Sequence, residues 1–294
     1  MYYRRKILLS LLKEFGGELE KIKLQKLLFL LTQKQKSPSF YFVPYKYGCF
    51  SFQANRDLKT MIKYEMVDMI EDKVRLTGQL DYREQLKNED KTALKQSFNN
   101  FRNLNSEDLI KLVYKNYPYF AIKSEIAGEL LSESELKQIR NCIPVNDSIL
   151  LYSIGYEGKT IEQYVNILIN EDIRLLVDVR KNPLSMKFGF SKNQLKSILE
   201  NVNIDYLHIP SLGINSSKRK DLKTYTDYQN LFDEYEKQTL QERKDEIKEL
   251  ENLLNKNKRI ALTCFEADHN YCHRSRVINK FSELIGNHYE IIHL

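Results

Sequence analysis

The chain has 294 residues, of which 42% are hydrophobic and 29% are charged, and its formal net charge is +6. This length predicts about two domains with sizeable cores, and the composition excludes a disordered chain. The apolar runs are too short to span a bilayer, and four scattered cysteines are too few for a disulfide framework. We therefore expect a cytoplasmic protein that has no membrane partner.

The positive charge is concentrated in the first part of the chain. Residues 1–79 carry 15 Lys and Arg against 8 Asp and Glu, a net charge of +7, whereas the remaining residues sum to −1. Such asymmetry favours a polyanion as the partner of the N-terminal part, and we expect DNA more than RNA. A solvated basic surface is the alternative that the charge count leaves open.

The pattern of residues 1–79 predicts a small, basic, winged-helix-like domain. Apolar side chains recur at helical spacing, and an aromatic, β-prone stretch separates the second helix from the third. The expected elements are helices at 3–15, 21–34 and about 53–64, followed by a hairpin at 66–77. Three helices followed by a hairpin is the order of a winged-helix module.

Two stretches of this domain also resemble a known group of proteins. They are "LQKLLFLLTQ" at 24–33 and "FVPYKYGCFSFQANRDL" at 42–58. Both are similar to the Panacea-type antitoxin and related winged-helix-like domains. The resemblance implies a DNA-binding or antitoxin-like role for the N-terminal part.

Residues 80–147 predict a polar helical connector, and residues 148–294 predict a second domain. From 148 onward, β-rich runs alternate with amphipathic helical stretches. Strands are expected in 148–156, 174–180, 205–213, 259–267 and 288–294, and helices in 160–170, 192–202, 221–257 and 275–285. This alternation predicts an α/β fold with a Rossmann-like, mostly parallel sheet covered by helices.

Residues capable of chemistry follow four of these predicted strands. They occur in "GYEGKT" at 155–160, "DVRKNPLSMKFGFS" at 178–191, "PSLG" at 210–213 and "CFEADHNYCHR" at 264–274. Ligands of open α/β sheets bind at the carboxyl ends of the strands, so the four segments are expected to form one site.

The same segments resemble a known family. "IGYEGKTIEQY", "LLVDVRKNPLSMKFGFSK", "DYLHIPSLG" and "ALTCFEADHNYCHRS" are similar to the motifs of the domain-of-unknown-function 488 family, in the same order. The resemblance covers about 150–294. It implies a Rossmann-like fold and a polar pocket built from these loops, and it implies no reaction.

Our candidate site combines carboxylates with cations, aromatic rings and a histidine. We predict Glu157, Asp178 and Glu266 as catalytic residues. The predicted substrate-binding residues are Tyr156, Arg180, Asn182, Ser185, Lys187, Phe188, Cys264, His273 and Arg274. Arg180, Lys187 and Ser185 suit a phosphate group, and Arg274 lies where a helix N-terminus would attract an anion.

Structural explanations compete with several of these predictions. Glu157 suits a turn carboxylate that caps the next helix, and Asp178 with Arg180 suits a buried ion pair. Zinc is a further alternative for Cys264, Cys272 and a histidine, but the spacing C-x7-C-H lacks the paired C-x-x-C of common zinc sites. We therefore expect no metal and no cofactor, with the cysteines as small buried spacers.

These features favour an enzyme that processes nucleic acid. Carboxylates opposite guanidinium groups suit hydrolysis of an N-glycosidic bond, and Tyr156 or Phe188 would stack on a flipped base. The specific hypothesis is a DNA glycosylase-type hydrolase that acts on modified bases in defence against foreign DNA. One alternative is a non-catalytic DNA-binding regulator whose α/β domain senses a ligand. Another is a redox enzyme that uses Cys264 or Cys272.

Overall fold

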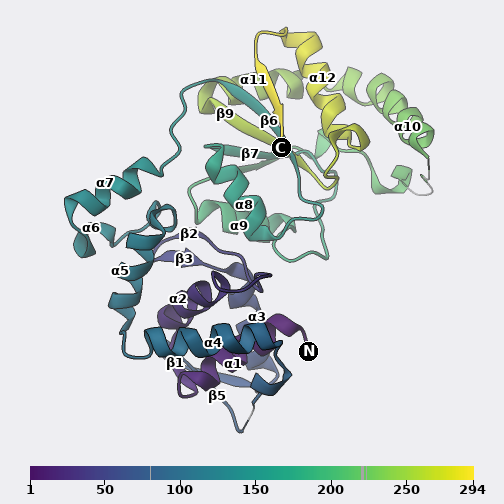
Figure 1. The fold of residues 1–294 in the computed structure, drawn as a ribbon. Coiled ribbons are helices and arrows are strands. Elements are labelled where there is room, and N and C mark those ends of the chain that lie inside the picture. The colour runs from purple at the N-terminus through teal and green to yellow at the C-terminus, as the bar shows by residue number, and fades with distance from the viewer. Residues whose placement is uncertain (80, 220–221, 223) are drawn as a thin grey trace. The chain divides into compact units, whose positions relative to one another are not determined.

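The computed structural model describes residues 1–79, 81–219, 222 and 224–294. It divides the chain into two compact units, Met1–Ile143 and Pro144–Leu294 (Figure 1). Each unit has its own hydrophobic core. No helix in the described residues has the length and hydropathy that crossing a bilayer requires.

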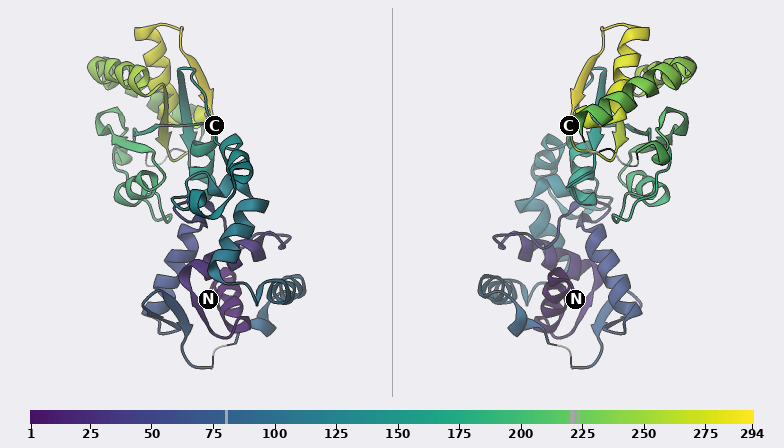
Figure 2. Two further views of the ribbon diagram at one scale, coloured as in Figure 1. Left: turned by 90° about the vertical axis from the view of Figure 1, so that its left-hand side faces the viewer. Right: turned by 90° about the vertical axis from the view of Figure 1, so that its right-hand side faces the viewer.

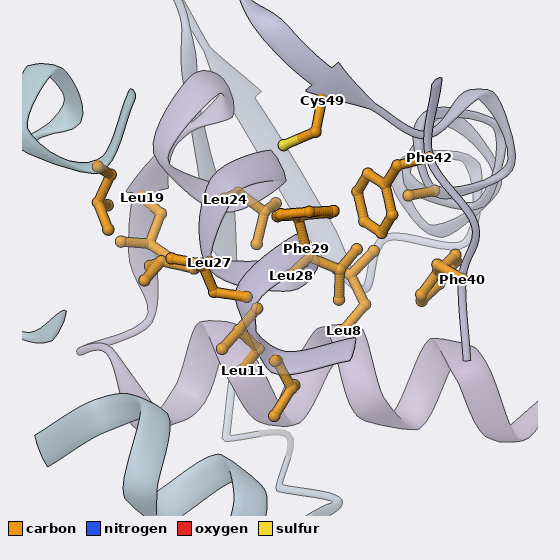
Figure 3. Packing of buried hydrophobic residues seen from close by; sticks show 14 of the residues in the cluster. Leu8, Leu11, Leu19, Leu24, Leu27, Leu28, Phe29, Phe40, Phe42 and Cys49 are labelled. Atoms are coloured by element: carbon orange, nitrogen blue, oxygen red, sulfur yellow. The ribbon is translucent and has the colours of Figure 1, made fainter. Parts of the chain in front are cut away.

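The first unit begins with the three predicted helices and the predicted hairpin, to which the structure adds β1 and a second hairpin, β2–β3. Its elements are α1 (Tyr3–Glu14), β1 (Glu18–Glu20), α2 (Lys21–Thr32), β2 (Val43–Tyr45), β3 (Gly48–Phe50), α3 (Phe52–Lys63), β4 (Val67–Ile70) and β5 (Lys73–Leu76). Strands β1, β5 and β4 form an antiparallel sheet in that order. The leucine stripes of α1 and α2 form the centre of the core, with Phe40 and Phe42 packed beside them (Figure 3).

The described residues expected as a connector belong to this first unit as far as Ile143, and residues 144–147 belong to the second unit. They form α4 (Asn88–Phe101), α5 (Ser106–Asn116), α6 (Ala127–Leu130) and α7 (Glu133–Asn141). These helices are amphipathic, and they bury Leu94, Leu109, Val113 and Ile139 in the same core as α2. Because this apolar face needs a partner, the helices pack on the first unit and do not form a separate spacer.

The second unit contains an all-parallel sheet flanked by helices, as the alternating pattern predicted. Its strands are β6 (Leu150–Gly155), β7 (Leu175–Asp178), β8 (Asp205–His208), β9 (Arg259–Cys264) and β10 (Glu290–His293). Within the described residues the strand order is β10-β6-β9-β7-β8, and every neighbouring pair is parallel. The architecture is Rossmann-like.

Helices cover both faces of this sheet. They are α8 (Ile161–Asn170), α9 (Lys192–Glu200), α10 (Tyr225–Gln238), α11 (Lys244–Asn257) and α12 (His273–Ile285). Figure 1 shows α8 and α9 on one face, and α10, α11 and α12 share a core with the other. The helix expected over 221–257 is two helices, separated by a short turn at Leu240–Glu242. Residues 221 and 223 of that prediction lie outside the described residues.

The position of β9 determines which loops meet. It lies between β6 and β7, although it follows both in the chain. Its connection runs to α12, whereas the connections of β6 and β7 run to α8 and α9 on the opposite face (Figure 1). Loops that leave neighbouring strands in opposite directions open a crevice at the carboxyl edge of a sheet.

Figure 2 shows α12 and β10, both yellow, side by side in two further views.

Candidate functional site

The loop after β9 lies directly against the end of β6. A Cβ atom on Gly155 would lie 1.8 Å from the carbonyl oxygen of Glu266, so only glycine permits this approach. The Glu157 amide donates to the Phe265 carbonyl at 2.9 Å. In return, the Ala267 amide donates to Glu157 Oε2 at 3.0 Å. The two loops are therefore fixed to each other by both backbone and side chain.

Arg180, just beyond β7, joins three segments of the site. Its guanidinium donates to both carboxylate oxygens of Asp178, at 2.8 and 2.6 Å. It also donates to the Tyr156 hydroxyl and to the Phe190 carbonyl, each at 2.9 Å. Burial by itself lowers the pKa of Arg180, but the hydrogen bonds and charge of Asp178 outweigh it and raise that pKa above its usual value. The arginine is a permanent cation that positions the Tyr156 ring.

Aromatic rings form the wall above this cation. The ring of Tyr156 stacks on Phe190, with centroids 4.3 Å apart and planes 10° apart, and Phe265 meets Tyr156 edge to face. Gly189 places Phe190 there, because its backbone has φ +90° and a Cβ would lie 2.7 Å from Ile161. The close approach that Gly189 permits is thus to helix α8. Its role is to pack the loop after β7 against the helix.

These loops enclose one cavity of about 350 Å³. Its lining comes from the loops after β6, β7, β8 and β9 and from the start of α12. The lining residues are Tyr156, Arg180, Lys181, Asn182, Leu184, Ser185, Met186, Ile214, Cys264, Phe265 and His273. The volume is within the range of roughly 300–1,000 Å³ that ligand sites occupy. The crevice expected at the carboxyl edge of the sheet is therefore present.

Two thiols and an imidazole meet at the wall of the cavity. Cys264 ends β9, and Cys272 and His273 begin α12. The Sγ atoms lie 3.5 Å (Cys264) and 3.9 Å (Cys272) from His273 Nδ1. His273 Nε2 donates to the Val179 carbonyl at 2.9 Å, so Nδ1 is the ring nitrogen that faces the sulfurs. All three side chains are buried.

The electrostatics of this cluster do not favour a redox role for Cys272. Burial raises the pKa of the Cys272 thiol well above its ordinary value, with the Cys264 thiol and the charge of Glu266 adding to the rise. A thiol with a raised pKa is a poor nucleophile in exchange reactions. Cys264 donates to Glu266 Oε2 at 3.1 Å, so a carboxylate adjoins the two sulfurs.

Arg274 holds the loop that carries Glu266. Its guanidinium donates to the carbonyl of Glu266 at 2.5 Å, to the carbonyl of Ala267 at 3.0 Å and to the Ser153 hydroxyl at 3.3 Å. The side chain is fully buried. The prediction that Arg274 faces a ligand therefore needs correction, since its donors are used on the protein backbone.

Six of the twelve predicted site residues line the cavity. They are Tyr156, Arg180, Asn182, Ser185, Cys264 and His273. The three predicted catalytic carboxylates are absent from the lining. Asp178 is fully buried and accepts from Arg180 and, at 2.6 Å, from the Tyr206 hydroxyl. Since those bonds occupy its lone pairs, Asp178 is an anchor for the arginine and has no capacity left for acid–base chemistry.

Glu157, Lys187 and Phe188 also lie outside the cavity lining. Glu157 is used in bracing the loop after β9, as its hydrogen bond with Ala267 shows. Lys187 Nζ donates to the Tyr156 carbonyl at 3.0 Å. Partial burial lowers the pKa of Lys187, and the positive charge of Lys159 lowers it further. The ammonium group therefore supports the loop and does not cradle a phosphate inside the cavity.

Sequence reasoning missed the apolar rim of the cavity. Leu184 and Met186 are almost wholly exposed, at 84% and 104%, and Phe265 is 43% exposed. All three line the cavity. The available signal was the pair of large apolar side chains in the otherwise polar loop "KNPLSMK". The sequence analysis also did not predict Cys272 as a site residue. Its proximity to Cys264 depends on the path of the intervening loop, which the sequence pattern does not reveal.

Fold and site together define an α/β domain with a ligand-sized cavity at the carboxyl edge of a parallel sheet. Residues 160–281 of that domain match a family model described as domain of unknown function DUF488. The matched region includes the loops after β7, β8 and β9 and ends within α12. No curated protein and no solved structure matches the chain significantly. The N-terminal resemblance to winged-helix-like domains stays a prediction.

Proposed function

We propose that the chain is a nucleic-acid-processing hydrolase whose second unit takes a base from DNA and cleaves its N-glycosidic bond. The observation that carries the proposal is a cavity of about 350 Å³ with exposed Leu184 and Met186 on its rim. Enzymes that act on a base must extrude it from the stack, and proteins that unstack DNA insert apolar wedges between bases. Exposed large apolar side chains beside a base-sized cavity suit that task.

The cavity lining has the groups that a flipped base requires. The half-exposed ring of Phe265 is available for stacking on a base, and Asn182 offers an amide donor and acceptor for a base edge. Arg180 also lines the cavity, and its buried pair with Asp178 fixes the position of the guanidinium. Two of the predicted carboxylates are hydrogen-bonded to lining side chains, Asp178 to Arg180 and Glu266 to Cys264, but Asp178 is occupied by its bonds with Arg180 and Tyr206. We therefore assign the general base to Glu266.

We also propose that the first unit is a winged-helix module that binds duplex DNA. Its element order, with β1, β5 and β4 in one antiparallel sheet, supports this assignment. Helix α3 exposes Arg56, Lys59 and Lys63, whose spacing places them on one face of the helix. An α-helix fits the major groove of DNA but not the deep, narrow one of RNA, so α3 favours DNA.

The direct test is incubation of the purified chain with DNA that carries modified or ordinary bases. Alkaline treatment then cleaves the strand wherever a base has been removed. We expect scission with a subset of the modified substrates and none with the Glu266→Gln variant. DNA that stays intact with every substrate, or scission that is undiminished in Glu266→Gln, would contradict the proposal.

The proposal includes a role in defence against foreign DNA. Cells that express the chain should then reduce the plating of phages whose DNA contains a susceptible base. The matched control is the Glu266→Gln variant at equal expression. Equal plating on both strains across a panel of modified phages would refute the defensive role and leave the enzymatic one standing.

A non-catalytic regulator that senses a ligand in the same cavity is the second candidate. It is favoured by the structural use of Asp178 and Glu157, and no carboxylate is found among the described residues that line the cavity. A sensor should keep its DNA affinity and its ligand response in Glu266→Gln. An enzyme should keep DNA affinity in that variant and lose turnover, so the two measurements together separate the candidates.

A further inference from the structure

We propose that Cys264, Cys272 and His273 bind a zinc ion at the wall of the cavity, with a fourth position left for water beside Glu266. The metal site follows from the positions of the side chains. Its role as the source of the attacking water rests on the proposed hydrolase function.

The distances within the cluster match tetrahedral coordination. Bonds of about 2.3 Å to sulfur and about 2.0–2.1 Å to nitrogen place the two ligand atoms roughly 3.5 Å apart around a tetrahedral ion. The two Sγ–Nδ1 distances are 3.5 Å for Cys264 and 3.9 Å for Cys272. The three potential ligand atoms all lie within 4.8 Å of one another. Small side-chain adjustments therefore suffice for binding.

The surroundings orient the ligands as a metal site requires. A metal-bound histidine usually donates its other ring N–H to a carbonyl or carboxylate, and His273 Nε2 donates to the Val179 carbonyl. The loop between the two cysteines is held by Arg274, which binds the carbonyls of Glu266 and Ala267. Fixed ligands on the end of a strand and the start of a helix make the cluster a preorganised site.

The donor set selects the ion and its role. Two thiolates with one imidazole suit zinc, whereas calcium and magnesium prefer oxygen ligands. Three protein ligands with an open position are typical of catalytic zinc, and structural zinc usually has four. Because Cys264 and His273 line the cavity, an ion that they hold borders the space for the ligand.

Bound zinc would supply hydroxide near neutral pH, because it lowers the pKa of its water to about 7. In the proposed step, the water oxygen forms a bond to the sugar carbon, and the bond from that carbon to the base nitrogen breaks. The electron pair of the broken bond stays on the nitrogen. The proton that the water loses on becoming hydroxide would pass to Glu266 and then to that nitrogen, while the other hydrogen stays on the new hydroxyl group, so one water is consumed for each base released.

Metal content of the full-length chain is the first measurement. After dialysis against zinc and then against metal-free buffer, mass spectrometry should find about one zinc per chain. The matched control is Cys142→Ala, which removes a partly exposed thiol of the first unit and should leave the zinc content unchanged. Cys272→Ala and His273→Ala should lose the zinc.

A second measurement on the unaltered chain covers the case in which those buried variants fail to fold. Cobalt added to the chelator-treated chain should produce thiolate-to-cobalt absorption, and zinc should slow alkylation of Cys264 and Cys272. Absence of both the zinc and the cobalt absorption in the unaltered chain would overturn the proposal, whatever the variants do.

Activity then separates this inference from the proposed function. Glu266→Gln should retain zinc and lose roughly 10²–10⁴-fold in rate, as expected for a general base. Loss of zinc in this variant would overturn the assignment of Glu266 as a base. Base release by the zinc-free chain would refute the role of the metal and leave the hydrolase standing. A cobalt–thiolate signal without base release from any DNA would refute the hydrolase and leave the metal site standing.

Discussion

At the scale of single residues, Arg180 organises the candidate site. It lies just past the end of β7 and donates to Asp178, to the Tyr156 hydroxyl and to the carbonyl of Phe190. One side chain thus fixes the loop after β6 relative to the loop after β7. Because the cation and its carboxylate are both buried, the loss of either partner leaves an uncompensated charge.

The first prediction concerns that ion pair. Asp178→Asn should destabilise the fold by about 3–5 kcal/mol, since the buried Arg180 loses its counter-charge. Urea denaturation measures the change. The matched control is Asp172→Asn, which removes a partly exposed ion pair with Arg174 and should cost at most about 1 kcal/mol. Equal losses of unfolding free energy in the two variants would show that the Arg180–Asp178 pair contributes no more to stability than the Asp172–Arg174 pair.

The second prediction concerns the exposed apolar residues of the rim. The double variant Leu184→Ser, Met186→Ser should change stability by no more than about 0.5 kcal/mol, because both side chains are exposed. It should nevertheless lose most of the base release, since the wedge is gone. Val145→Ser, at an equally exposed apolar position (80%), is the control and should be inert. An undiminished single-turnover rate in the double variant argues against base extrusion by these residues.

At the scale of elements, the site depends on loops that lie in direct contact. The end of β6 accommodates the loop after β9 only because Gly155 lacks a side chain. The loop after β9 is then fastened by Glu157 on one side and by Arg274 on the other. The same loop carries Glu266 and precedes Cys272, so its path decides where both side chains lie.

A third prediction tests this contact between loops. Gly155→Ala should cost at least about 1–3 kcal/mol and move the loop after β9, because the new Cβ would clash with the Glu266 carbonyl. Gly128→Ala, where a Cβ meets nothing within 4 Å, is the control and should be neutral or slightly stabilising. Chemical denaturation measures the loss of stability, and zinc content reports the movement of the loop. A neutral Gly155→Ala variant would mean that the loop has another path open to it.

The fourth prediction concerns pH and the contact between this loop and β10. His293 stacks on His269 with ring centroids 3.9 Å apart, and its Nδ1 lies 2.7 Å from the Ser153 hydroxyl oxygen. Partial desolvation of the ring lowers the pKa of His293, although the residue as a whole is exposed, and electrostatic interactions with His269 and Arg274 lower it further. Below its ordinary pKa of about 6.5, the unfolded chain binds the proton first, so stability falls as pH decreases.

His293→Gln isolates that contribution. Unfolding free energies of the two proteins should run parallel above about pH 7. As the pH falls below the ordinary pKa of histidine, the unaltered chain should lose stability faster than the variant. Parallel curves down to about pH 5 would show that the protonation of His293 is not linked to folding.

At the scale of the whole molecule, charge and chemistry are divided between the two units. The basic residues of the first 79 positions account for the net charge of the chain. The cavity and the thiol–imidazole cluster belong to the second unit, which has its own core. The first unit is therefore expected to supply DNA affinity, and the second to supply the reaction.

The fifth prediction tests this division. Replacing Arg56, Lys59 and Lys63 of α3 with alanine should weaken DNA binding at all sequences. It should also reduce the salt dependence of binding, by about one unit of slope for each phosphate that the protein no longer neutralises. The control triple, Lys87→Ala, Lys95→Ala and Lys137→Ala, removes the same charge from exposed positions outside α3. Equal weakening by both triples would indicate general electrostatic attraction without a role for α3. Zinc content should be unchanged in either.

The sequence by itself determined the fold class and most of the elements of the second unit. Leucines at helical spacing predicted α1 and α2, and the alternation after residue 148 predicted a parallel sheet with its polar loops at one edge. Such patterns are local, because a segment of a given periodicity must turn its apolar side toward a core wherever that core lies.

Only the tertiary structure decided what the site contains. The strand order places β9 between β6 and β7, which brings Cys264 among loops that lie far apart in the chain. The path of the loop after β9 returns Cys272 to the neighbourhood of Cys264. Long-range packing sets the strand order and the loop paths. Neither is encoded in the local periodicity of the sequence. For this reason the sequence predicted a polar site at the correct edge of the sheet, but assigned carboxylates where the geometry supports two thiols and an imidazole.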